Sequence, residues 1–426
     1  MADAPSEPLR TAILGQGYVG LPLAIRAAQV GYQVVGFDTD ADRVKRLQAA
    51  ESLSPDVPAE QIATALAKGL YVPTTRPEDL AGFEVAVIAV PTPLRDGAPD
   101  LSAIEHAGLA LAPHLQPGCV IILESTTYPG TTDDVLRPVL EAASGLRAGE
   151  DFRLGYSPER IDPGNRIWTL QNTPKIVSGI DDASLRAVSD FYQSLVDTVV
   201  EVAGVRDAEL AKLLENTFRQ VNIALVNELA VHAQQLGTDI WAALDAASTK
   251  PFGFMRFTPG PGVGGHCLPV DPTYLSWQVR RQTGQALRLV EAADEVNAAM
   301  PAYIVQRLTD ALNRKGLPVN GSRILLLGMA YKPNTGDIRN SPTITIARLL
   351  AEHGAQIEIV DPHIDDPFGL DARVRYSQLT ASNLVASDAV ALLTDHDAFD
   401  LRLVEDHAQY VLDCRARLSG AKVERL

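Results

Sequence analysis

Short apolar runs recur at regular intervals in the first third of the chain, and helical patterns lie between them. The runs are TAILG at 11–15, YQVVGFD at 32–38, FEVAVIAV at 83–90 and CVIILEST at 119–126. A second series comprises RILLLG at 323–328, IEIVD at 357–361, DAVALLT at 388–394 and YVLDC at 410–414. Such alternation predicts βαβ units that build a parallel sheet. We therefore expect an α/β protein with two doubly wound, Rossmann-like halves.

The segment between the two halves has a different pattern. Arg206–Leu236 contains neither Gly nor Pro, and its apolar residues recur about every 3.6 positions, which predicts one long helix. Gly204 and Gly237 flank it. Further along, the Pro- and Gly-rich stretch PFGFMRFTPGPGVGG at 251–265 is too patterned for a linker, and we interpret it as a binding loop.

Composition narrows the possible classes of protein. A chain of 426 residues with 46% apolar and 21% charged side chains exceeds what one hydrophobic core usually serves. The net charge of −16 argues against a nucleic-acid partner. We see no signal peptide and no apolar run long enough for a membrane span. Three widely spaced cysteines suggest neither a disulfide framework nor a zinc site, and they favour a reducing cytoplasm.

A dinucleotide-binding turn follows the first predicted strand. In Gly15-Gln16-Gly17-Tyr18-Val19-Gly20, the glycines let the backbone approach a pyrophosphate, and the helix N-terminus favours its negative charge. Asp38, at the end of the second strand, supplies a carboxylate for the ribose hydroxyls and would repel a 2′-phosphate, so NAD is favoured over NADP. The alternative is a Gly-rich turn with a capping Asp. The candidate cofactor residues are Gly15, Gly17, Tyr18, Val19, Gly20, Asp38, Arg43, Thr92 and Thr126.

The late repeat lacks this glycine fingerprint. Its first strand is followed by a polar loop at 328–342 that carries Lys332 and Arg339 where a second dinucleotide would otherwise bind. Two cations in that position predict a different, phosphate-bearing ligand.

Cys267 lies in a loop suited to a nucleophile. Glycines precede it in GGHCLPVD at 264–271, and the surrounding residues are polar, as an accessible thiolate requires. The alternative, a small buried hydrophobic side chain, is the role we assign to Cys119 and Cys414. No second His or Cys stands at ligand spacing from His266, so we expect no metal there and interpret His266 as a local structural residue.

Two further groups of candidate site residues also have ordinary structural interpretations. Lys212 and Asn216 are four residues apart, so they lie on one face of the long helix, where they could stabilise an alkoxide. A helical lysine is more often solvated surface. Glu159 and Arg160, in SPER, could merely belong to a turn.

Seven motifs in order resemble the UDP-glucose/GDP-mannose dehydrogenase family nearly end to end. They are GQGYVG, VPTPL at 90–94, ESTTYPGTT at 124–132, YSPER at 156–160, the Lys212/Asn216 helix, PGPGVGGHCLPVDP and YKPNTGDIRNSP. The HC pair, the SPER form and the FGFMRFTPGPG loop resemble most closely the branch that acts on UDP-N-acetylglucosamine or UDP-N-acetylmannosamine.

The resemblance implies two successive NAD-dependent oxidations of the sugar C6 alcohol, with Cys267 forming a thiohemiacetal and then a thioester. It implies that Lys212 and Asn216 stabilise oxyanions, that Asp271 and a water near Thr126 relay the first proton, and that Glu159 activates the hydrolytic water. The implied substrate-binding residues are Glu159, Arg160, Lys212, Asn216, Arg256, Gly264, Lys332 and Arg339.

The resemblance also implies a three-part homodimer. We expect an NAD-binding domain at 1–203, a central helical domain for dimerisation at 204–300 that carries the cysteine loop, and a nucleotide-sugar domain at 301–426. UDP-glucose or GDP-mannose is the nearest alternative substrate. A β-hydroxyacid dehydrogenase would oxidise once and need no cysteine. A non-catalytic NAD-binding protein is a third alternative, against which the intact set of Cys267, Lys212, Asp271 and Glu159 argues.

Overall fold

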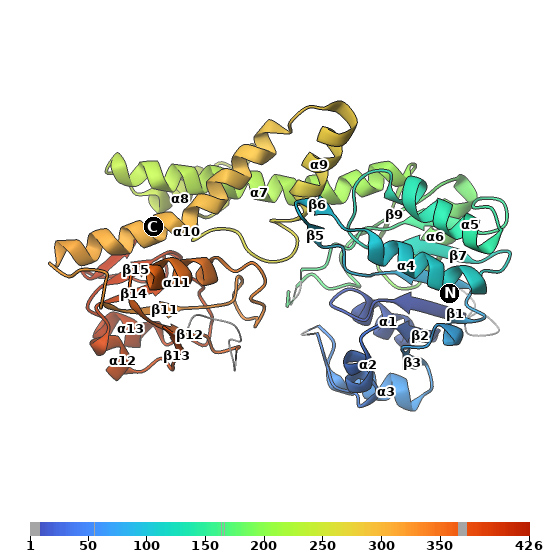
Figure 1. The fold of residues 1–426 in the computed structure, drawn as a ribbon, viewed down its shortest axis with the longest axis horizontal. Helices are drawn as coiled ribbons and strands as arrows, with labels where there is room; N and C mark the ends of the chain where they lie inside the picture. Colours follow the sequence, from blue (N-terminus) through green and yellow to red (C-terminus); the bar gives the residue numbers. More distant parts are fainter. Residues whose placement is uncertain (1–8, 55, 163, 166, 365–372) are drawn as a thin grey trace. The chain divides into compact units, whose positions relative to one another are not determined.

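The computed structural model describes residues 9–54, 56–162, 164–165, 167–364 and 373–426 (Figure 1). The chain forms two compact units, Met1–Glu215 and Asn216–Leu426. In the part of the chain that the structure describes, no helix has both the length and the apolar composition that crossing a membrane requires.

The first unit is built on an eight-stranded sheet with the order β10-β9-β8-β7-β4-β1-β2-β3. Its strands are β1 (Arg10–Leu14), β2 (Gln33–Phe37), β3 (Tyr71–Thr74), β4 (Val85–Ile88), β7 (Val120–Leu123), β8 (Arg153–Tyr156), β9 (Lys175–Gly179) and β10 (Val199–Val202). The four strands predicted here, β1, β2, β4 and β7, are confirmed. Their continuous apolar runs reflect burial on both faces of the sheet.

Helices cover this sheet, as Figure 1 shows. They are α1 (Gly20–Gln29), α2 (Ala41–Gln48), α3 (Ala59–Ala67), α4 (Ser102–Leu111), α5 (Arg137–Ser144) and α6 (Asp182–Gln193), with short turns η1 (Pro77–Leu80), η2 (Ala112–His114) and η3 (Thr132–Leu136) and a small hairpin of β5 (Leu94–Arg95) and β6 (Ala98–Pro99). Apolar side chains of α1, α3 and α6 pack into one core with the strands.

One strand of the first sheet departs from the parallel pattern. β9 pairs antiparallel with β8, whereas the other neighbouring strands of this sheet pair parallel. The first residue of β9, Lys175, therefore lies at the edge where β7 and β8 end. This edge is where doubly wound sheets bind their ligands.

The predicted long helix is confirmed as α7 (Val205–Gln235). In the first unit, Glu209 anchors α7 to the turn that follows β7. Its carboxylate accepts hydrogen bonds from Gly130 N at 2.5 Å, from Thr132 N at 2.9 Å and from Thr132 Oγ1 at 2.7 Å. Because Glu209 is fully buried, these bonds replace the water that its carboxylate loses. They hold the start of α7 in place.

The second unit contains a six-stranded, wholly parallel sheet with the order β13-β12-β11-β14-β15-β16. The strands are β11 (Arg323–Leu327), β12 (Gln356–Val360), β13 (Val374–Tyr376), β14 (Ala389–Leu392), β15 (Val411–Asp413) and β16 (Val423–Arg425). The helices are α8 (Ile240–Ser248), α9 (Asp271–Thr283), α10 (Arg288–Arg314), α11 (Pro342–Glu352), α12 (Ala381–Ala386) and α13 (Leu401–His407). Apolar clusters pack on both faces of the sheet.

The same kind of glycine turn follows β1 in the first sheet and β11 in the second. Gly15 after β1 and Gly328 after β11 both have a φ of 91°, which favours glycine. Each glycine N–H donates a 2.8 Å hydrogen bond to the last residue of the neighbouring strand, and an aspartate, Asp38 or Asp361, follows that residue. The late repeat therefore keeps the first glycine of the dinucleotide turn and lacks the other two.

Candidate active site

The glycine turn after β1 has the geometry that a dinucleotide requires. A Cβ atom on Gly15 would lie 2.3 Å from Ala89 O, and one on Gly20 would lie 1.8 Å from Gly15 O, so both positions exclude a side chain. A Cβ on Gly17, in contrast, would meet no atom within 4 Å. Gly15 and Gly20 thus permit the tight turn and the close packing of helix on strand, while Gly17 leaves the backbone open to an approaching pyrophosphate. The residues fit NAD.

Asp38 and Arg43 lie together beside this turn. The Asp38 carboxylate is 6% exposed and accepts hydrogen bonds from Gln16 N at 2.7 Å and from Arg43 Nη1 at 2.9 Å. Arg43 also faces Asp40, with 3.6 Å between Nη2 and Oδ2. One guanidinium between two carboxylates leaves this corner with a net negative charge, which disfavours a 2′-phosphate. Tyr18 is exposed and Val19 is half-buried at the start of α1.

The predicted residues at the ends of the third and fourth predicted strands, now β4 and β7, are brought together. Thr92 Oγ1 donates to Thr126 O at 2.8 Å, and Ser125 Oγ donates to Val90 O at 2.8 Å. Thr92 is buried, whereas Thr126 is half-buried. These bonds join the two loops at the carboxyl edge of the sheet, next to β1 and its glycine turn.

Lys212 and Glu159 also meet in the first unit. Both side chains are nearly buried, and Lys212 Nζ donates to the backbone carbonyl of Glu159. The alternative of a solvated surface lysine is therefore excluded. Arg160 donates to Pro174 O at 2.6 Å and forms an ion pair with Glu215 at 2.7 Å. The SPER segment is thus tied to α7 through Lys212 and Glu215.

Two buried charged residues behind Glu159 were missed by the sequence analysis. Lys175 Nζ contacts Glu124 Oε1 and lies 3.1 Å from Pro158 O and 3.5 Å from Glu159 Oε2. In the sequence, each of these residues is marked by its place at one end of an apolar strand. That pattern does not predict their contact, because only the antiparallel direction of β9 brings Lys175 to the edge where Glu124 and Glu159 lie.

The second unit holds Cys267, Asn216 and Asp271. Cys267 is exposed. Asp271, the first residue of α9, is 2% exposed; its N–H donates to Cys267 O at 2.8 Å, and its Oδ2 accepts a 2.5 Å hydrogen bond from Asn216 Nδ2. The Asn216 amide therefore contacts the Asp271 carboxylate, and Asp271 begins α9 one turn after Cys267.

The other two cysteines are buried, as predicted. Cys119 precedes β7 and is 5% exposed, and Cys414 follows β15 and is fully buried. Burial raises the pKa of the Cys119 thiol and raises that of Cys414 to about 12. Both remain protonated thiols at neutral pH, so of the three cysteines only Cys267 is exposed for nucleophilic attack.

The cysteine loop is bound to the polar loop after β11. Gly265 N donates to Arg339 O at 2.8 Å, and Asn340 Nδ2 donates to Gly265 O at 3.0 Å. Tyr331 packs over the glycines, since a Cβ on Gly264 or Gly265 would lie 2.6 or 2.8 Å from its side chain. The structure therefore brings the predicted Gly264 and Arg339 into one assembly with Cys267. Lys332, next to Tyr331, is half-buried, and the Arg339 guanidinium pairs with Asp337 at 2.6 Å.

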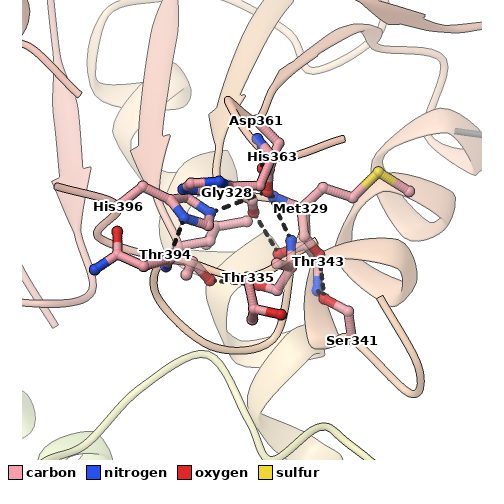
Figure 2. Close-up of polar contacts among 12 residues, drawn as sticks. Gly328, Met329, Thr335, Ser341, Thr343, Asp361, His363, Thr394 and His396 are labelled. Atoms are coloured by element: carbon pink, nitrogen blue, oxygen red, sulfur yellow. Dashed lines mark hydrogen bonds and ion pairs between the residues drawn. The ribbon is translucent and has the colours of Figure 1, made fainter. Parts of the chain in front are cut away.

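Asp361 fixes the start of that polar loop, as Figure 2 shows. Its carboxylate accepts hydrogen bonds from Met329 N, Ala330 N, His363 N and His396 Nε2 at 2.8–3.0 Å. His396 Nδ1 in turn accepts a 3.0 Å bond from Asn334 N, so the buried imidazole links two parts of the loop. Asp38 occupies the equivalent position in the first sheet. The Asp361 carboxylate, however, already accepts these hydrogen bonds from groups of the second unit. This argues against a second dinucleotide site.

Arg256 is placed apart from these groups. Its guanidinium pairs with Asp245 Oδ1 at 2.7 Å and with Ser248 Oγ at 3.2 Å, both on α8. Among the hydrogen bonds and ion pairs of the described residues, none joins Arg256 to the cysteine loop or to the loop after β11. Its role at the substrate stays a prediction.

Family models cover most of the chain. The NAD binding domain of the UDP-glucose/GDP-mannose dehydrogenase family matches residues 9–196, its central domain matches 206–299 and its UDP binding domain matches 325–419.

Similar proteins span nearly the whole chain. A protein from Pseudomonas aeruginosa named UDP-N-acetyl-D-glucosamine 6-dehydrogenase is 38% identical over 358 residues, which cover 84% of this chain and 83% of the relative. A UDP-N-acetyl-D-mannosamine dehydrogenase from Pyrococcus horikoshii is 36% identical over 394 residues, which cover 92% of this chain and 90% of the relative. A solved structure of a UDP-D-ManNAc dehydrogenase from Pyrococcus horikoshii superposes with a TM-score of 0.88 at 32% identity, covering 98% of this chain and 99% of that one.

Substitutions in the glycine turn should separate NAD binding from folding. We expect Gly17→Ala to keep the thermal stability of the NAD-free protein, because the new methyl group meets open space, and to weaken NAD binding about tenfold or more, because that space admits the pyrophosphate. Gly20→Ala should instead lower the melting temperature, because its methyl group would clash with Gly15 O. Calorimetric NAD titration and thermal melts measure both effects. Unchanged NAD affinity in Gly17→Ala would contradict the assignment of this turn.

Proposed function

Because the chain belongs to the UDP-glucose/GDP-mannose dehydrogenase family, we propose that it oxidises the C6 alcohol of a UDP-N-acetylhexosamine to the uronic acid with two NAD. The chemistry is carried by one observation: the exposed Cys267 lies on a loop bonded to the loop of Lys332 and Arg339. The loop of the proposed nucleophile is thereby joined to a loop that carries two cations suited to a diphosphate. The relatives named for UDP-N-acetylglucosamine and UDP-N-acetylmannosamine support this substrate class.

In the first half-reaction, the C6 alcohol becomes an aldehyde. Bound NAD accepts the hydride that leaves C6 in each of the two oxidations. Asp271, through a water near Thr126, takes the hydroxyl proton, and the Asn216 amide that donates to Asp271 keeps its carboxylate oriented. Lys212 and Asn216 stabilise the alkoxide, because an ammonium and an amide donor lower the free energy of developing negative charge on oxygen.

In the second half-reaction, the Cys267 thiolate attacks the aldehyde carbon and forms a C–S bond. The resulting thiohemiacetal loses the second hydride and becomes a thioester. Water then attacks the thioester carbonyl, its proton passes to Glu159, and the C–S bond breaks to release the acid and return the thiolate. One alcohol, two NAD and one water thus give one carboxylate, two NADH and three protons.

The remaining residues bind the nucleotide sugar. We propose that Lys332 and Arg339 hold the diphosphate, since the chain as a whole carries a charge of −16 and must attract an anion through local cations. Gly264 lets Tyr331 pack against the cysteine loop and so shapes the loop that receives the sugar. Arg160 holds the SPER segment through Pro174 and Glu215 and contributes to substrate binding, and Arg256 wraps over the substrate. The proposed domains are 1–203 for NAD, 204–300 for the cysteine loop and dimerisation, and 301–426 for the nucleotide sugar.

We propose that the functional protein is a homodimer. Phe218, Leu225 and Leu229 are 46–52% exposed on α7, and their spacing of seven and four residues places them on one face. Leu236, which is 76% exposed, follows directly after the helix. Long exposed apolar rows are typical of protein interfaces. A second copy of the chain is the simplest partner, because a twofold axis would bury the same row on both copies.

The yield of NADH tests the reaction. With the sugar nucleotide limiting and NAD in excess, we expect two NADH per UDP-N-acetylhexosamine consumed to completion, because the thioester route oxidises C6 twice. UDP-N-acetylglucosamine, UDP-N-acetylmannosamine, UDP-glucose and GDP-mannose are assayed in parallel, and NADH is measured at 340 nm. A yield of one would indicate a single oxidation, and a two-to-one yield with UDP-glucose or GDP-mannose alone would identify the alternative substrate. Cys267→Ala should form no acid, so acid at the normal rate from that variant would exclude the thiol as nucleophile.

Charge on the apolar face of α7 tests the dimer. Leu225→Glu with Leu229→Glu should convert the dimer to a monomer, because two carboxylates per copy would have to be buried unpaired. Light scattering measures the mass. Leu109→Glu is the matched control, since Leu109 is 52% exposed on α4 of the first unit. The proposal fails if the wild-type protein is monomeric, or if the double variant has the mass of the wild type.

A further inference from the structure

We propose that Lys175 and Glu124 are positioning residues for Glu159, and that the three form one buried group that keeps Glu159 ready to take the proton of the hydrolytic water. This inference rests on the proposed function, in which Glu159 serves the thioester step. It adds two residues that contact neither substrate nor cofactor, and act through Glu159.

The topology of the first sheet brings the three side chains together. Glu124 follows β7, Glu159 follows β8, and Lys175 begins β9. Because β8 and β9 pair antiparallel with Tyr156 opposite Ser178, the continued register places Glu159 opposite Lys175. The side chains of Glu124, Lys175 and Glu159 are 0%, 4% and 10% exposed. The ammonium is therefore shared by two carboxyl groups away from bulk water.

The charges in this group are unequal. Two ionised carboxylates beside one ammonium would leave a net negative charge in the interior, which is costly. Burial raises the pKa of Glu124 to about 7, and the nearby Glu159 carboxylate acts in the same direction, while Lys175 opposes it. Burial would also raise the pKa of Glu159, but Lys175 brings it below its ordinary value. Of the two carboxyl groups, Glu124 is therefore the one that takes up a proton first as the pH falls through about 7, while Glu159 remains the acceptor.

The other groups around Glu159 make different contacts. Tyr192 OH donates to Glu124 Oε2 at 2.9 Å, and the tyrosine ring lies 5.0 Å from Lys175 Nζ. Ile161 N donates to Glu159 Oε1. Lys212 also lowers the pKa of Glu159 through its charge, but its hydrogen bond goes to the backbone carbonyl of Glu159.

Arg160 is directed to Pro174 and Glu215. Lys175 is thus the ammonium that contacts the Glu159 carboxylate, which leaves Lys212 to act on the substrate. Loss of Lys175 should make Glu159 bind its proton more tightly, so thioester hydrolysis should need a higher pH. Formation of the thioester should be little affected, because it depends on Cys267.

The experiment follows one turnover of Lys175→Met as a function of pH. The enzyme is mixed with NAD and the best substrate of the panel, and acyl-enzyme is quantified by acid quench and intact mass. We expect the acid-side midpoint of hydrolysis to rise by about one pH unit or more, with the first NADH formed at the normal rate. Lys175→Arg should restore most of the midpoint, since it keeps the charge. Lys68→Met, which removes an exposed lysine at the end of α3, is the control and should match the wild type.

A second variant is made for the case that Lys175→Met does not fold. Lys175→Met alone leaves Glu124 without its ammonium, whereas Lys175→Met with Glu124→Gln also replaces the Glu124 carboxyl group by a neutral amide of similar shape and should show the same upward shift. A wild-type midpoint in whichever of these variants folds would overturn the proposal. If the wild-type protein yields fewer than two NADH per sugar, the proposed function itself has failed, and that result is independent of the variants.

Discussion

The ammonium of Lys175 lies between the carboxyl groups of Glu124 and Glu159 in the interior of the first unit, at the edge where β7 and β8 end. Charge in such a place persists only when it is paired, because the energy of desolvating an ion exceeds that of most other interactions in a fold. The pairing fixes the SPER segment, and the carbonyl of Glu159 then receives Lys212 from α7. The positions of Glu159 and of the Lys212 ammonium that binds its carbonyl therefore follow from one buried ion group.

In the second unit, hydrogen bonds that involve the backbone hold the loops in place. The thiol-bearing loop is held by Gly265 and Asn340, and the loop it binds is fixed at its start by Asp361. The turn after β11 copies that after β1, but its aspartate is saturated internally. One kind of turn thus begins the NAD binding domain in the first sheet and, in the second, supports the loop that we propose binds the diphosphate.

Much of this was predictable from the sequence. The apolar runs predicted β1, β2, β4 and β7 and their counterparts in the second sheet, because strands buried on both faces need continuous hydrophobic residues. Cys267 and Asp38 were found because they belong to local motifs. Glu124 and Lys175 were missed because they are 51 residues apart and meet only through the reversed direction of β9. Likewise, α10, whose helical pattern contains Pro301, was not anticipated.

The central claim is that Cys267, in the second unit, and Glu159, in the first, act in one reaction. The most direct test is the intact mass of Glu159→Gln after mixing with NAD and the substrate. We predict a stable adduct of one sugar-nucleotide acyl group per chain, mapped to Cys267, with two NADH released and little acid formed. Full production of acid without an adduct, or an adduct at another residue, would contradict the claim.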